Sequence, residues 1–301
     1  MKKSPLKSAL AALAILPIAA LLAGCAGNAG SSDSANGENE TVKIGVVGAS
    51  DPYWETYVDA AADEGITVEL VDFSDYNQPN PALAEGEIDL NQFQHIVYLA
   101  QYNEANGQDL VTVGSTAIYP LGLYSTQYDS VKDIPEGATV AIPNDPSNLA
   151  RALLVLQSAD LLTLKGGGDS YSTVADIDEA KSRVTVTELD PALTATSLPD
   201  VAAAIINNEF ILDSGLEATD AIAQDDPSDP NSLPYINIFA ARAEDKDNKT
   251  FKKLVEIYQD TKAVTDGVVD VSGGTALIVK TPVEELQASL ETEQKQFAEK
   301  G

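Results

Sequence analysis

Short hydrophobic runs rich in β-branched residues alternate along this chain with longer amphipathic segments. The pattern starts at Thr41 with Thr-Val-Lys-Ile-Gly-Val-Val-Gly, a run that predicts a buried parallel strand because both of its faces are largely apolar. Further strands are predicted at 66–73, 110–114, 118–125, 139–143, 184–189, 204–207 and 234–241. Helices are predicted at 54–64, 80–85, 92–105, 148–162, 198–203, 248–261 and 282–300. Such alternation predicts an α/β fold with mostly parallel sheets.

The first 40 residues carry a different pattern, which is typical of export. Lysines at positions 2, 3 and 7 precede an apolar run from 9 to 22, and Leu-Ala-Gly leads directly into Cys25. We therefore predict a signal peptide at 1–24 and lipid attachment at the Cys25 thiol, including palmitate. Residues 25–40 are small and polar, which predicts a flexible linker. The expected location is the extracytoplasmic face of the cell membrane, and the alternative is an ordinary secretion signal with an incidental cysteine.

Charge and composition exclude several classes of function. The chain has 47 acidic against 18 basic residues, for a formal net charge of −29. Nucleic acids and anionic lipid headgroups are bound through basic patches, so neither is an expected partner. One histidine and one cysteine cannot build a zinc or copper site, and we expect no metal and no cofactor. Without a Gly-x-Ser-x-Gly motif or a free cysteine an enzyme is not expected, although an exported hydrolase that uses His95 remains an alternative.

The most specific chemistry lies at the start of the predicted helix 148–162, in the run Asn-Asp-Pro-Ser-Asn-Leu-Ala-Arg that ends at Arg151. Asp145 is typical of an N-cap and Pro146 of a first helical residue, so we expect the amides of this helix start to face an anion. Asn148 and Arg151 are three residues apart and share one helical face, while leucines occupy another. A guanidinium beside free amides predicts a carboxylate receptor. The alternative is a surface helix with a stray arginine.

Other binding candidates are aromatic or polar residues near the ends of predicted elements: Tyr76, Phe93, His95, Tyr98, Tyr119, Asn207 and Asn237. The imidazole of His95 and the phenol of Tyr98 are predicted on one helical face, where both can donate and accept hydrogen bonds. Phe93 offers a flat apolar wall, and core packing is the alternative for it and for Tyr98. An asparagine in an apolar strand needs partners, which are either backbone groups or the ammonium of a ligand.

Four stretches in a fixed order resemble the NlpA family, which comprises lipid-anchored, methionine-binding substrate receptors of ABC importers. They are Asp75-Tyr-Asn-Gln-Pro-Asn-Pro-Ala-Leu, Gly86-Glu-Ile-Asp-Leu-Asn-Gln-Phe-Gln-His, Tyr119-Pro-Leu-Gly-Leu-Tyr-Ser and Ile142-Pro-Asn-Asp-Pro-Ser-Asn-Leu-Ala-Arg. The resemblance extends from Thr41 to about Thr261. The chain departs from the family pattern after Asn207, where Asn-Glu-Phe-Ile replaces small polar residues and a tyrosine.

The resemblance implies a periplasmic-binding-protein-like fold of type II, with two α/β lobes joined by two crossing hinge strands. Lobe 1 is then expected at 41–120 plus 240–301, and lobe 2 at 121–239 with the hinge strands. The implied function is delivery of methionine, or a close analogue, to an ABC transporter permease in amino-acid transport. Arg151 takes the carboxylate and aromatic residues hold the thioether. The implied ligand-binding residues are Tyr76, Phe93, His95, Tyr98, Tyr119, Asn148, Arg151, Asn207 and Asn237.

Two alternatives stay open beside this function. One is a receptor for a short peptide or another apolar amino acid, since sulfur–aromatic contacts of roughly 0.3–1.5 kcal/mol do not separate methionine decisively from leucine. The other is a surface lipoprotein that has no ligand.

Overall fold

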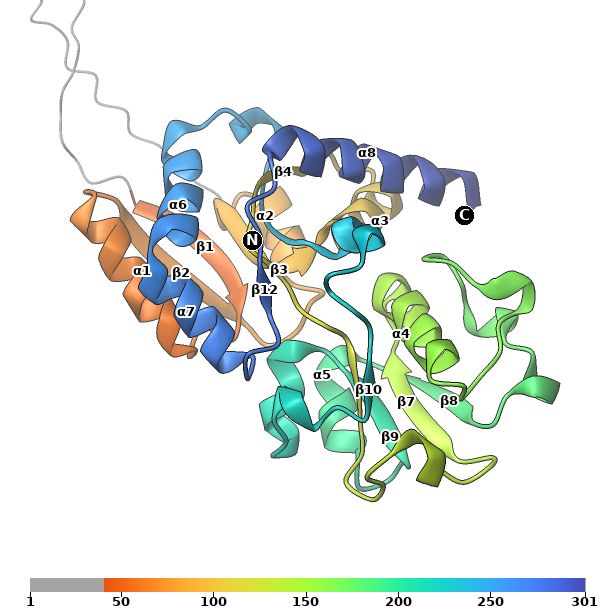
Figure 1. Cartoon of the computed structure of the whole chain (residues 1–301). Coiled ribbons are helices and arrows are strands. Elements are labelled where there is room, and N and C mark those ends of the chain that lie inside the picture. Colours follow the sequence, from red (N-terminus) through yellow and green to blue (C-terminus); the bar gives the residue numbers. More distant parts are fainter. Residues whose placement is uncertain (1–40, 301) are drawn as a thin grey trace, which may run out of the picture. The chain divides into compact units, whose positions relative to one another are not determined.

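The structure is a computed structural model that describes residues 41–300. The predicted signal peptide, Cys25 and the linker lie outside the described residues. Within 41–300 two five-stranded sheets, each accompanied by helices, form two lobes (Figure 1). The α/β architecture predicted from the alternating pattern is confirmed, but the expectation of mostly parallel sheets was wrong, because each five-stranded sheet contains two parallel and two antiparallel pairings.

Lobe 1 is built on a sheet with the strand order β2-β1-β3-β11-β4. Its strands are β1 (Thr41–Val47), β2 (Thr67–Phe73), β3 (Leu90–His95), β4 (Val111–Ser115) and β11 (Asn237–Ala241). β1 runs parallel to β2 and β3, whereas β11 is antiparallel to β3 and β4. The helices are α1 (Pro52–Asp63), α2 (Pro79–Ala84), α3 (Ile96–Asn106), α6 (Lys249–Asp260), α7 (Lys262–Val271) and α8 (Val283–Lys300). A small ladder joins β5 (Ala117–Ile118) to β12 (Leu277–Ile278).

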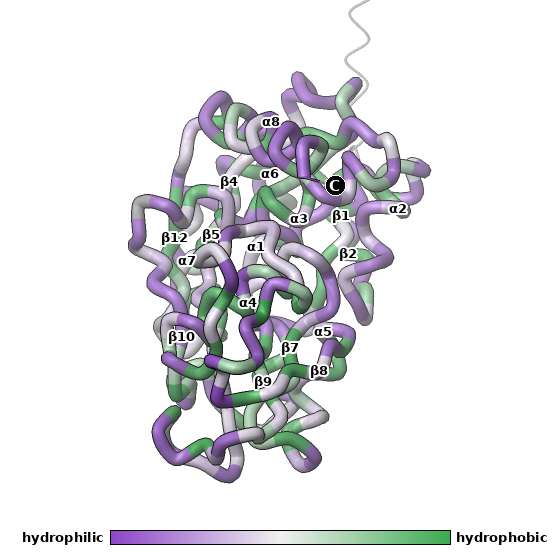
Figure 2. Tube along the Cα trace, turned by 90° about the vertical axis from the view of Figure 1, so that its right-hand side faces the viewer, coloured by the Kyte–Doolittle hydropathy of each residue, from purple (hydrophilic) through white to green (hydrophobic). Residues whose placement is uncertain are grey.

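Lobe 2 has the strand order β10-β6-β9-β7-β8. Its strands are β6 (Gly122–Tyr124), β7 (Thr139–Pro143), β8 (Thr185–Leu189), β9 (Ala203–Ile206) and β10 (Ala223–Gln224), and its α-helices are α4 (Pro146–Ser158) and α5 (Pro191–Thr194). β9 and the middle of β7 are hydrophobic, which is the green end of the scale in Figure 2, and they are buried at the centre of this sheet. The leucines of α4 pack against them, as the helical pattern predicted.

Short 3₁₀ turns fill many of the connections in both lobes. They span Val131–Asp133, Lys165–Gly167, Val174–Asp176, Glu179–Lys181, Ala195–Ser197, Asn208–Ser214, Ala218–Asp220, Pro230–Tyr235 and Ala243–Asp245. The turn at Asn208–Ser214 leaves β9 at the lobe interface. Its residue Phe210 belongs to a buried cluster that also contains Tyr76 and Phe93 of lobe 1, so apolar contacts join the two lobes.

Helix α8 belongs to lobe 1 but also contacts lobe 2. It packs along α3 and β4 (Figure 1), where Leu286 and Leu290 are completely buried. Towards its C-terminal end, Glu293 accepts a hydrogen bond from the hydroxyl of Tyr171 in lobe 2 at 2.5 Å. Lys300, at the end of the same helix, forms an ion pair with Asp169. The predicted helix at 282–300 is confirmed, and it forms part of the core.

The prediction of a helix at 92–105 was wrong for its first four residues, which complete strand β3. Pairing with β1 and β11 decides the conformation there, since both neighbours supply backbone hydrogen bonds. The polar side chains of this strand find partners with one another and with α2. Gln94 accepts from Asn80 at 2.7 Å, and Asn91 donates to Asn80 at 2.9 Å.

The helix predicted at 198–203 was also wrong. The chain places a helix earlier, at Pro191–Thr194, where the carboxylate of Asp190 caps it by accepting from the amide of Ala192. Residues 203–206 are instead drawn into the sheet as β9, between β6 and β7. The helix α7 was not predicted at all.

The two segments that cross between the lobes differ in part from the predicted hinge strands. The first crossing runs from the end of β4 to β6, and the predicted strand 118–125 is interrupted between Ile118 and Gly122. The second crossing occupies 225–236. All of β11 pairs within the lobe 1 sheet, so the boundary expected at 239/240 divides a strand and needs correction.

Candidate functional site

A small cavity lies where the two lobes meet. It is lined by Tyr76, Phe93, Gln94, His95, Tyr98, Tyr119, Asn148, Arg151, Asn208, Glu209 and Asn237. All the predicted ligand residues except Asn207 are in this lining, although they come from segments far apart in the sequence. Asn207 contacts a lining residue directly, because its Nδ2 donates to Oδ1 of Asn148 at 3.0 Å. The cavity is narrow, with about 30 Å³ open to the centres of water molecules.

Aromatic rings form one wall of the cavity. The ring centroids of Tyr76 and Phe93 are 5.8 Å apart, and those of Phe93 and Tyr98 are 5.7 Å apart. Phe210 of lobe 2 adds a further ring 5.2 Å from Tyr76. Such tilted and edge-on contacts hold the rings in fixed orientations, so the wall is preformed.

A carboxylate of the chain itself, that of Asp145, occupies the N-terminal end of α4. Asp145 caps the helix, and its Oδ1 accepts from the backbone amide of Asn148 at 2.9 Å and from the Asn148 side chain at 3.0 Å. Asp145 was predicted as the N-cap, which is confirmed. The expectation that this helix start offers its amides to a ligand is wrong for the amide of Asn148, because the capping carboxylate already uses it.

His95 is held in one tautomer by hydrogen bonds to both ring nitrogens. It ends β3 and caps α3, where its Nδ1 accepts from the backbone amide of Tyr98 at 3.2 Å. The proton is therefore on Nε2, which points at Oδ1 of Asn148 across the lobe interface at 3.4 Å. Burial, and then the charge of Arg151, lower the pKa of His95 to about 3. The imidazole is neutral at ordinary pH, and no serine, threonine or cysteine lines the cavity beside it.

The buried neutral imidazole makes a prediction about pH. In the unfolded chain the pKa of His95 returns to about 6.5, so its contribution to stability is present above that value. As pH falls from about 6.5 towards 3, the contribution decreases by about 1.4 kcal/mol per pH unit, because the unfolded state binds a proton that the folded state does not. Urea unfolding at pH 7, 6 and 5 measures this in the wild type and in His95→Gln.

Comparing the two proteins cancels the titration of the carboxylates that they share. The wild type is expected to lose more of its free energy of unfolding than His95→Gln between pH 7 and 5. A difference between the two that stays constant with pH would contradict the assigned protonation state.

Arg151 is 5% exposed and connects both crossing segments. Its Nε donates to Asp225 at 2.5 Å, and its Nη2 donates to the carbonyl of Tyr119 at 2.9 Å. The guanidinium lies over the ring of Tyr235, 4.3 Å from the centroid. Among the residues from 41 to 300, no acceptor is present for Nη1. Arg151 is thus both a lining residue of the cavity and a structural tie between the lobes and their connections.

Sequence reasoning missed five residues that line or support this site: Gln94, Asn208, Glu209, Asp225 and Tyr235. Glu209 lies two residues after Asn207 at the end of a strand, so its position near a predicted site residue could have drawn attention to it. Asp225 lies in an acidic loop that holds several other carboxylates, and nothing local distinguishes the one that meets Arg151. Both pair with groups more than 70 residues away.

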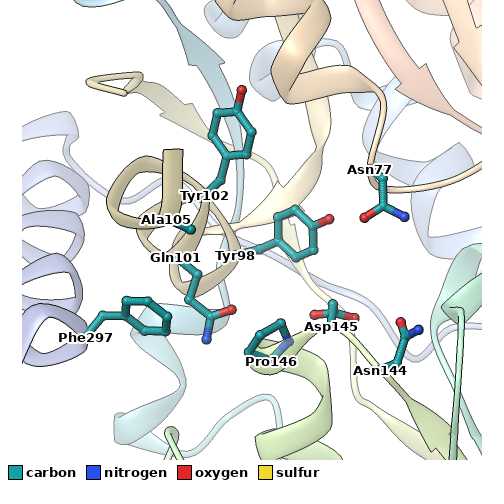
Figure 3. Close-up of a pocket in the computed structure, with 9 residues that line it drawn as sticks. All are labelled: Asn77, Tyr98, Gln101, Tyr102, Ala105, Asn144, Asp145, Pro146 and Phe297. Atoms are coloured by element: carbon teal, nitrogen blue, oxygen red, sulfur yellow. The ribbon is translucent and has the colours of Figure 1, made fainter. Parts of the chain in front are cut away.

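A groove opens beside the cavity (Figure 3), with a volume of about 330 Å³. Tyr98, Gln101, Tyr102 and Ala105 of α3 form one side, and the residues around the start of α4 form the other. Tyr98 lines both the groove and the cavity, so its ring separates the two spaces. Its hydroxyl donates to the carbonyl of Tyr76 at 3.0 Å, which fixes the ring in that position.

In residues 41–300 no cluster of three or more His, Cys, Asp or Glu side chains is arranged to hold a metal ion. Within the same range no helix combines the length and the apolar character needed to span a membrane.

The family profile of the NlpA lipoproteins matches residues 42–277. The chain belongs to the NlpA lipoprotein family. It is 40% identical over 223 residues to the D-methionine-binding lipoprotein MetQ of Escherichia coli K12, an alignment that covers 72% of this chain and 81% of that protein. Helix α8 lies beyond the part of the chain that the profile matches.

Solved structures of similar proteins share the fold. The substrate-binding protein of a methionine transporter from Streptococcus pneumoniae is 37% identical, with a TM-score of 0.74 and coverage of 79% of this chain and 95% of that one. A nutrient-binding protein from Burkholderia cenocepacia, solved bound to methionine, is 39% identical, with a TM-score of 0.73 and coverage of 79% and 99%. The predicted two-lobed substrate-binding fold is confirmed.

Family membership settles the class of function. NlpA lipoproteins are substrate-binding proteins, so this chain is a binding protein and not a hydrolase that uses His95. The same relationship implies a small-molecule ligand and a membrane transporter as partners. The names of the relatives agree with an extracytoplasmic location at the membrane.

Proposed function

We propose that this chain is a lipid-anchored extracytoplasmic receptor that binds methionine, or a close analogue, and delivers it to the permease of an ABC transporter. The observation that carries the proposal is the cavity between the lobes, whose lining combines Arg151 with the rings of Phe93 and Tyr98. The names of the relatives supply the ligand class, since they are D-methionine-binding and methionine-transporter proteins.

The chemistry of the lining fits a zwitterionic amino acid with an apolar tail. Nη1 of Arg151 is the guanidinium nitrogen left for a ligand carboxylate. Oδ1 of Asn207 is buried and has no partner among the described residues, and a buried acceptor without a donor is costly. An ammonium supplies that donor, with Asn237 as a second amide in the lining. The thioether is then expected to pack against the aromatic rings of the lining, which belong to Tyr76, Phe93, Tyr98 and Tyr119.

Ligand binding and transport are linked through the lobe interface. The cavity lining comes from both lobes, and Asn148 of lobe 2 meets His95 of lobe 1 across it. A ligand that contacts both sides stabilises the arrangement in which the lobes meet, by the difference between its contacts there and in an open form. The permease can then distinguish the receptor with bound ligand from the empty receptor by the arrangement of the two lobes.

The membrane part of the proposal depends on the N-terminal sequence. The run Leu-Ala-Gly before Cys25 supports processing to a lipid-modified cysteine, and residues 25–40 supply a tether. The proposed location is the outer face of the cell membrane, where the permease partner lies.

A ligand screen tests the function. Protein freed of carried-over ligand by unfolding, dialysis and refolding is titrated calorimetrically with L-methionine, D-methionine, norleucine, leucine and methionine-containing dipeptides. We expect one methionine enantiomer to bind most tightly and to raise the melting temperature in proportion to ln(1 + [L]/Kd). Norleucine is the matched control, because it replaces only the sulfur. Tighter binding of leucine or a dipeptide, or no binding of either methionine, would contradict the proposal.

A further inference from the structure

Glu209 places a negative charge in the cavity without a positive partner. Its side chain is part of the lining, and its Oε2 accepts from the hydroxyl of Tyr76 at 2.6 Å. Between residues 41 and 300 no lysine, arginine or histidine forms an ion pair with it. Burial raises the pKa of the Glu209 carboxyl, which is the response of an acid that lacks a counter-charge.

A second acidic group stands near Glu209. A smaller cavity next to the first is lined by both Glu209 and Asp51, and the charge of Asp51 contributes to the raised pKa of Glu209. The positive group of the main cavity, Arg151, forms its ion pair with Asp225 and none with Glu209. The side of the cavity near Glu209 is therefore negative overall and favours a cation.

Asn207, which is close to Glu209 in the chain, supplies a second acceptor, one without a donor between residues 41 and 300. Its Oδ1 is buried without a donor among the described residues, and it lies two residues before Glu209, where β9 passes into the turn that carries the carboxylate. An amide oxygen without a donor and a carboxylate without a counter-charge make a pair of acceptors that suits an ammonium group. A compact ammonium has three N–H donors, enough for both acceptors and one more.

We infer that Glu209 is the counter-charge for the ammonium of the ligand, which makes it a specificity-determining residue of this site. The inference rests on the proposed function, because it takes the ligand to be a free amino acid. The consequence is a requirement for a cationic amine: analogues whose amine is missing or acylated leave the carboxylate unpaired in the cavity, at a cost in affinity.

The test compares methionine with 4-(methylthio)butanoic acid, which is methionine without its amine. Calorimetry is performed with the full chain as wild type, Glu209→Gln and Asp213→Asn, using the methionine enantiomer that the wild type binds more tightly. We expect Glu209→Gln to weaken methionine binding by about 10- to 100-fold, the range for a lost hydrogen bond to a charged group. Binding of the amine-free analogue is expected to change by less than about 3-fold, since it makes no such bond.

Asp213→Asn is the matched control. Asp213 lies in the same 3₁₀ turn and is exposed, so its substitution removes the same charge from the same segment without touching the cavity. A second variant, Glu209→Asp, keeps the charge and is expected to retain more of the preference for methionine over the amine-free acid than Glu209→Gln does. This variant also separates the loss of charge from a disturbance of packing.

Two results would overturn the inference while the proposed function stands: unchanged methionine affinity in Glu209→Gln, or equal weakening of both ligands in Glu209→Gln and Glu209→Asp alike. The second result would indicate a structural role for the side chain. Failure of the wild type to bind methionine would contradict the proposed function itself, and the inference would fall with it.

Discussion

Replacing Arg151 with alanine is expected to abolish most of the affinity for methionine and also to lower the stability of the protein. Truncating one partner of a buried charged hydrogen bond costs about 2–5 kcal/mol, which corresponds to roughly 30- to 5,000-fold in Kd. Stability falls as well, because Asp225 and the carbonyl of Tyr119 lose their shared donor. We expect about 1–2 kcal/mol for this structural part, since Asp225 keeps some contact with water. Calorimetry and urea unfolding measure the two effects.

Asp225→Asn separates the two roles of the guanidinium. It removes the protein's own carboxylate from Arg151 but keeps the guanidinium, so we expect lower stability with methionine affinity retained or increased. Arg151→Lys keeps the charge without the planar fork and is expected to bind more weakly than the wild type. Unchanged methionine affinity in Arg151→Ala would remove Arg151 from the site.

Substitution of Leu286 and Leu290 together by alanine is expected to unfold a large fraction of the protein. Both leucines of α8 are fully buried in a cluster with Leu99 of α3 and Ile238 of β11. Each buried Leu→Ala change costs about 2–5 kcal/mol, and the sum approaches the whole stability of an ordinary domain, about 5–15 kcal/mol. The prediction is a stringent one because α8 lies outside the part of the chain that defines the family.

Urea unfolding followed by circular dichroism measures this effect. Leu193→Ala is the matched control, since Leu193 also lies on a helix but is 54% exposed, and we expect it to change stability by less than about 0.5 kcal/mol. A double variant of α8 that unfolds at the same urea concentration as the wild type would show that the helix is not part of the core.

Most residues of the cavity lining could be predicted, partly from local signals and partly from the resemblance to the NlpA family. Asp145 and Pro146 predict where helix α4 begins, and the start of the helix determines which of its faces carries Arg151. The structure has the helix start at these residues. Phe93 and Tyr98 were placed near the cavity in spite of a wrong element, since a strand ending at His95 delivers them to the same edge.

The failures have a common physical cause. Residues 92–95 contain no Gly or Pro, and their local pattern fits a helix. In the structure they form a strand instead, because β1 and β11 on either side provide hydrogen-bond partners for their backbone groups. The partners of Arg151 and Tyr76 are Asp225 and Glu209, and each pairing depends on how the lobes meet, which local sequence does not specify. Contacts between distant segments were therefore the part that sequence reasoning missed.

The small size of the cavity has a kinetic consequence. Tyr98 separates the narrow cavity from the groove outside, and His95 meets Asn148 across the lobe interface, so an amino acid has no open path into the cavity in this arrangement. Entry and exit of a ligand therefore require the lobes to move apart. Because α8 and Tyr171 add a further contact between the lobes, the frequency of that parting sets how fast cargo is captured and released.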